Sequence, residues 1–157
     1  MFDTVFGLPV HSLVIHVTVI GLPLGALFTA VVAVRPGWRS RYAWWAVAVN
    51  GLLLAATFVA QESGKQLYER LGAPPEAATH RELALTLVWF ALALLVASIL
   101  LAPPLAAVAL ARSHGVAVHV LTVVVVAVAA ASVVQVARVG HAGTEAVWGS
   151  TVESTNP

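Results

Sequence analysis

The sequence predicts an all-α, polytopic membrane protein built as a bundle of four transmembrane helices. Hydrophobic residues make up 60% of the 157-residue chain and charged residues only 10%, and the mean hydropathy is +0.92. A soluble domain carries about 25% charged residues and could not cover so much apolar surface. The few charges that are present leave long uncharged gaps between them. The lipid bilayer is therefore the expected solvent of this chain.

Four gaps without Asp, Glu, Lys or Arg are long enough for a membrane crossing, which takes about 20 apolar residues. They predict spans over Val10 to Val34, Tyr42 to Ala60, Leu83 to Ala102 and Val116 to Ala137. We expect residues 1–148 to form a single four-helix transmembrane domain and residues 149–157 to form a short polar tail. No internal repeat is evident in the sequence.

Local signals predict where two of these spans begin. Thr79 and Glu82 have the spacing of a capping box, which would begin the third span. Ser113 is the expected cap of the fourth span. The one sizeable loop is expected from Gln61 to His80, with a short interfacial turn over Lys65 to Leu71 inside it.

The charges of the loops predict the orientation in the membrane. The two short connections on one side hold four arginines and no acid, whereas the N-terminus, the long loop and the tail hold all seven acids. Short loops rich in arginine stay in the cytoplasm. We therefore expect a multi-pass protein of the cytoplasmic membrane with both termini on the extracytoplasmic side.

Composition and motifs exclude several function classes. The chain has no cysteine, so disulfides and iron–sulfur clusters on thiolates are excluded. A formal net charge of +1 offers no basic surface for nucleic acid. No nucleophile stands in an acid–histidine arrangement and no glycine-rich phosphate loop occurs, so we expect no enzyme.

The histidines are the candidate functional residues. Four of the six would lie at the outer ends of the spans, namely His11, His16, His80 and His141, and Glu62 can reach the same layer. Neutral imidazole is the commonest transition-metal ligand and an axial ligand of haem. Spacing alone gives no preference between a ligand role and an interfacial role in which these histidines cap helix ends, because a histidine near a helix end costs little free energy.

The other polar residues of the spans favour structural roles. His114 and His119 would lie at the opposite end, where no further histidine can join them, so we expect an interfacial and a hydrogen-bonded side chain. Asn50 and Gln135 are expected to form hydrogen bonds between helices.

Four short motifs carry the outer histidines and their surroundings. They are His11-Ser12-Leu13-Val14-Ile15-His16, Gln61-Glu62-Ser63-Gly64, Thr79-His80-Arg81-Glu82-Leu83 and Gly140-His141-Ala142-Gly143-Thr144-Glu145-Ala146-Val147. In content and order they resemble the DUF2231 family, small prokaryotic four-span membrane proteins of unknown function, whose related domains are found fused to Rieske-type domains. Ser12 and Thr144 depart from the proline and glycine that are usual there. The resemblance implies that His11, His16, His80 and His141 are functional positions.

The sequence favours two function classes over a transporter, which would need broken helices and charges at the membrane midplane. The first is a membrane redox or cofactor-binding protein, in which a b-type haem would take His16 with His80 or His141 as axial ligands. A copper, zinc or iron ion would instead take three or four of His11, His16, His80 and His141, with or without Glu62. The Rieske fusions suggest a Rieske-type redox partner by association. The alternative class is a non-catalytic membrane subunit or scaffold with no cofactor.

Overall fold

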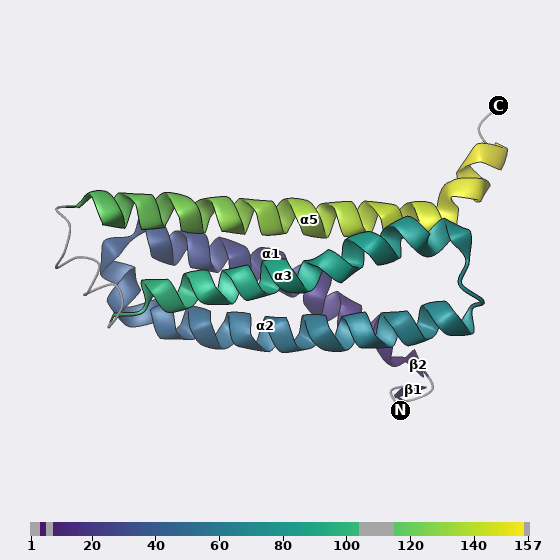
Figure 1. Ribbon diagram of the computed structural model, residues 1–157, viewed down its shortest axis with the longest axis horizontal. Coiled ribbons are helices and arrows are strands. Elements are labelled where there is room, and N and C mark those ends of the chain that lie inside the picture. The colour runs from purple at the N-terminus through teal and green to yellow at the C-terminus, as the bar shows by residue number, and fades with distance from the viewer. Residues whose placement is uncertain (1–3, 6–7, 104–114, 156–157) are drawn as a thin grey trace.

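The computed structural model describes residues 4–5, 8–103 and 115–155, and four long helices dominate this part of the chain (Figure 1). The helices are α1 (Val10–Val34), α2 (Pro36–Arg70), α3 (Ala78–Leu101) and α5 (Val116–Thr155), with a short 3₁₀ turn, η1 (Pro75–Ala77), ahead of α3. The two-residue strands β1 (Thr4–Val5) and β2 (Leu8–Pro9) pair antiparallel before α1. All four helices are long and apolar enough to cross a membrane. The predicted all-α, four-span architecture is confirmed.

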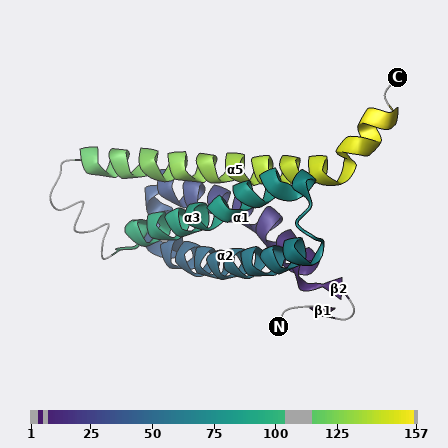
Figure 2. The same cartoon turned by 45° about the vertical axis from the view of Figure 1, so that its right-hand side comes forward.

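The helices run side by side along the long axis of the molecule (Figures 1 and 2). Each packs against two neighbours in the cyclic order α1, α2, α3, α5, and α1 also contacts α3 across the centre. The start of α1, the end of α2, the start of α3 and the end of α5 lie together, and we call this the terminal end of the bundle. Large apolar side chains such as Leu52, Trp89 and Val123 point outward, as expected for a surface in lipid.

The predicted first span coincides with α1, but α2 and α5 are longer than the spans predicted for them. The prediction of a separate interfacial turn over Lys65 to Leu71 is wrong, because α2 continues without interruption to Arg70. The helix ends where Gly72 and Ala73 adopt positive φ angles of 78° and 54°. A left-handed backbone stops an α-helix. α5 likewise continues through residues 149–155, which project beyond the bundle (Figure 1).

The predicted capping box at the start of α3 is also wrong. The residue that precedes the helix is Ala77, no side chain caps the first turn, and Thr79 is already inside the helix. The helical backbone begins earlier because Pro75 opens the η1 turn, which continues directly into α3. Proline is preorganised for the first position of a helix. The proposed cap Ser113 lies outside the described residues.

Two buried amides link the helices, as predicted. The Asn50 side-chain amide donates to the hydroxyls of Thr29 at 2.8 Å and Ser98 at 2.6 Å, and so joins α2 to α1 and α3. Gln135 of α5 donates to the Thr86 hydroxyl of α3 at 2.8 Å. In an apolar bundle such bonds satisfy polar groups that neither lipid nor neighbouring aliphatic side chains can satisfy.

The buried positions of the bundle repeat between its two halves. When α1 is counted from His11 and α3 from His80, buried residues fall at the same positions in both helices. These pairs are Leu22 and Ala91, Thr29 and Ser98, and Val32 and Leu101. The same holds for α2 counted back from Gly64 and α5 counted back from Gly143. The corresponding buried pairs are Leu53 and Ser132, Thr57 and Val136, and Ala60 and Val139.

This repeat has a spatial counterpart. Exchanging α1 with α3 and α2 with α5 preserves the up-and-down direction of the helices and maps every neighbouring helix pair onto another neighbouring pair. The α1–α2 hairpin and the α3–α5 pair are therefore related by a pseudo-twofold axis along the bundle. Residues that correspond in the two halves lie on opposite sides of this axis.

Candidate functional site

A cavity of about 520 Å³ lies at the terminal end of the bundle. Residues of all four long helices and of the α2–α3 connection line it, and most of the lining is apolar. The volume lies within the range of about 300–1,000 Å³ that is typical of small-molecule and cofactor sites. Among the outer histidines, His11 and His80 line this cavity.

His11 lies in the first turn of α1 and crosses to α2. Its Nδ1 lies 3.1 Å from the carbonyl oxygen of Ala60. A carbonyl oxygen can only accept, so the hydrogen of the neutral ring is on Nδ1 and Nε2 keeps its lone pair. The ring rests against Gly64, where a β-carbon would lie 2.7 Å from Cε1 of His11. Glycine at this position therefore permits the close approach of the imidazole to α2.

His80 repeats this arrangement in the other half of the bundle. Its Nδ1 lies 2.9 Å from the carbonyl oxygen of Val139 in α5, which again places the ring hydrogen on Nδ1. A β-carbon on Gly143 would lie 3.0 Å from the same Nδ1. Ala60 and Val139, like Gly64 and Gly143, correspond in the structural repeat.

The two imidazoles thus form a pseudo-symmetric pair on either side of one cavity. Each ring has its Nδ1–H fixed by a backbone carbonyl, which is the arrangement that orients histidine ligands in metal and haem sites and leaves Nε2 free to coordinate. A single ligand in the cavity can therefore be contacted by His11 from one half of the bundle and by His80 from the other.

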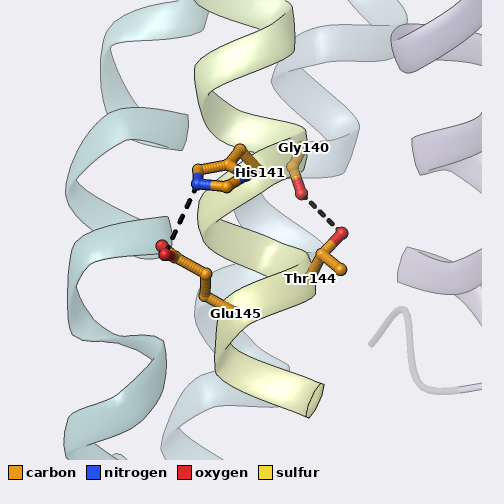
Figure 3. Close-up of polar contacts among 4 residues, drawn as sticks. All are labelled: Gly140, His141, Thr144 and Glu145. Carbon is orange, nitrogen blue, oxygen red and sulfur yellow. Dashed lines mark hydrogen bonds and ion pairs between the residues drawn. The ribbon is translucent and has the colours of Figure 1, made fainter. Parts of the chain in front are cut away.

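The other residues singled out in the sequence do not join this pair. His16 is exposed, and its Nδ1 lies 2.6 Å from the carbonyl of Ser12 in its own helix. His141 is 76% exposed and faces Glu145 along α5, with Nε2 at 3.4 Å from the carboxylate (Figure 3). Glu62 is exposed at the surface of α2. Within the described residues no three His, Cys, Asp or Glu side chains gather as a metal site.

Helical geometry separates His11 from His16. Five residues along an α-helix correspond to about 140° of rotation, so only one of the two can face the bundle. The contacts with Ala60 and Gly64 show that this residue is His11.

The histidines of the opposite end form no such pair in the described residues. His119 is exposed, and its Nδ1 lies 2.8 Å from the carbonyl of Gly115, which agrees with the predicted hydrogen-bonded side chain. His114 lies outside the described residues.

Sequence reasoning missed three cavity residues, Lys65, Tyr68 and Arg81. The Arg81 guanidinium lies 5.4 Å from the centre of the Tyr68 ring, within the range of a cation–π contact. The signal was present, because Arg81 directly follows His80 in the motif that opens α3.

A family model described as a predicted membrane protein, DUF2231, matches residues 7–156. The match covers nearly the whole chain and includes every residue of the cavity. No curated protein and no solved structure matches the chain. The description of the family gives a location in the membrane and no activity.

Proposed function

The chain belongs to the DUF2231 family of predicted membrane proteins, and we propose that it is a membrane redox protein that holds a b-type haem between His11 and His80. The observation that carries the proposal is the pseudo-symmetric imidazole pair at the cavity. His11 of α1 and His80 of α3 would hold the haem, one imidazole from each helix.

The residues of the cavity fit such a group. Both rings have Nδ1 engaged with a carbonyl and Nε2 available. The mostly apolar lining suits a hydrophobic macrocycle, and Arg81 supplies a cation at the cavity. The haem itself would supply a one-electron couple, whose potential depends on axial ligands, hydrogen bonding and burial. Electron transfer rather than catalysis is the proposed role.

Two imidazoles suit haem better than a bare ion. Zinc sites take three or four protein ligands, and copper ions in proteins are typically held by three or more. His16, His141 and Glu62 do not line the cavity, and His11 and His80 are the only His, Cys, Asp or Glu residues among its described lining.

An optical spectrum of the purified protein tests the proposal. Protein expressed with haem supplementation should contain about one haem per chain, with the reduced spectrum of a bis-imidazole b-type centre. Apoprotein incubated with haem should give the same spectrum. Protein that contains no haem after either treatment would contradict the proposal and favour a scaffold without a cofactor.

We further propose that the cavity faces the extracytoplasmic side, because Arg35, Arg39 and Arg41, around the connection between α1 and α2, lie at the opposite end of the bundle. Reporters fused after Arg112 should report a cytoplasmic position, and reporters fused after Gly72 or Pro157 an external one. The reverse pattern would place the cavity on the cytoplasmic side. A Rieske-type protein outside the membrane is the redox partner that we propose.

A further inference from the structure

The cavity is symmetric in its imidazoles but asymmetric in its charge. Lys65 of α2 and Arg81 of α3 line it on one side. The corresponding positions in the other half of the repeat are occupied by Thr144 and Ser12, which carry no charge. The pseudo-twofold relation that holds for His11 and His80 is thus broken by two cations on the α2–α3 side.

These two cations have no acidic partner in the part of the chain that the structure describes. Arg81 contacts the face of Tyr68, and its Nε is buried without a hydrogen-bond partner. Lys65 is exposed at the cavity and forms no ion pair with a described carboxylate. A buried donor on a charged group that lacks an acceptor costs free energy, and a bound acceptor would recover it.

We infer that Arg81, assisted by Lys65, binds the carboxylate groups of the ligand in this cavity. The ligand class is an amphipathic carboxylic acid, with its acidic edge toward the α2–α3 side and its apolar body among the remaining lining residues. This inference rests on the proposed function, because haem b, which carries both propionates on one edge, is the ligand to which we assign it. The planar guanidinium pairs well with a carboxylate, and the Tyr68 ring holds it in place.

A role for Arg81 only in contacting lipid headgroups does not explain its position in the cavity or its buried Nε. Interfacial arginines extend their charged group toward water and phosphate. Arg81 instead lines the cavity beside His80 and keeps Nε away from solvent.

Titration with haem b and with its dimethyl ester tests the inference. The ester keeps the macrocycle and the iron but has no carboxylate. We expect wild-type protein to bind haem b at least about tenfold more tightly than the ester, because charge-assisted hydrogen bonds are lost with the acid. Arg81→Met should weaken the binding of haem b by about the same factor and leave the binding of the ester unchanged. The affinity of the Arg81→Lys variant for haem b should lie between those of the wild-type protein and the Arg81→Met variant.

Arg138→Met is the matched control, because Arg138 is exposed on α5 and does not line the cavity. It should leave the affinity for both porphyrins unchanged. Gel filtration and thermal unfolding identify a misfolded Arg81→Met protein, in which case Arg81→Gln replaces it. Equal affinity of wild-type protein for haem b and the ester, with no effect of Arg81→Met, would overturn the inference and leave the proposed function intact.

Absence of binding by both porphyrins would instead contradict the proposed function. Oleate and methyl oleate then test the acid recognition alone, with the change in tryptophan fluorescence as the readout, because Trp148 lines the cavity. Binding of oleate but not of its ester, lost in Arg81→Met, would uphold the inference without haem. Equal responses to both compounds would overturn it.

Discussion

Replacing His11 or His80 by alanine should remove most of the bound haem, whereas replacing His16 or His141 should not. Each of the first two changes removes one of the two cavity imidazoles and leaves one axial position without a protein ligand. We expect the affinity for haem to fall at least about 100-fold and the spectrum to lose its bis-imidazole character, because a direct ligand contributes more than the groups that orient it. Haem content per protein and the reduced optical spectrum measure the effect.

The four variants control for one another. All of them remove an imidazole from the terminal end of a helix, so general damage to the bundle would affect them similarly. The imidazoles of His16 and His141 are exposed and bonded within their own helices. Equal haem loss in all four variants, or equal retention, would exclude the cavity pair as the site.

Alanine at Gly64 or Gly143 should weaken haem binding although neither residue contacts a ligand through a side chain. The new methyl group would lie 2.7 Å from Cε1 of His11 or 3.0 Å from Nδ1 of His80. The ring must then move away from the carbonyl that fixes its orientation. Loss of such an orienting bond typically reduces metal affinity by 10–100-fold, so we expect about a tenfold weaker binding of haem in each variant.

Gly51→Ala in α2 and Gly149→Ala in α5 are the matched controls. A β-carbon at either position meets no atom within 4 Å. Both variants should keep the affinity of the wild-type protein and gain up to about 1 kcal/mol in helix stability, since alanine is the better helix former. A haem titration of all four variants, with thermal unfolding alongside, separates the effect on the site from the effect on the helix. Unchanged affinity in Gly64→Ala and Gly143→Ala would show that the two rings need not rest against these helices.

Element boundaries show where sequence patterns were sufficient and where they were not. The end of α1 at Val34 follows from the uncharged run that stops at Arg35. The start of α3 does not follow from Thr79 and Glu82, because the helical backbone already begins at Pro75 in the η1 turn. A capping box requires a non-helical backbone at the capping residue itself, and Thr79 is already helical.

The internal repeat could not be found from the sequence. Corresponding buried positions hold different residues, such as Leu22 and Ala91, or Asn50 and Ala129. What repeats is the set of positions that face inward. Packing in a membrane bundle depends on volume and shape, so many side chains satisfy the same position and little similarity needs to remain.

The sequence by itself determined that the protein crosses a membrane four times and that its outer histidines lie at one end, because hydropathy and charge spacing are properties of the linear chain. Only the tertiary structure decided which of these histidines share a site. His11 and His16 are equally near the end of α1, and the rotation of that helix selects His11 by placing its ring against Gly64 and the Ala60 carbonyl. That rotation is fixed by the packing of α1 on α2, which no local pattern specifies.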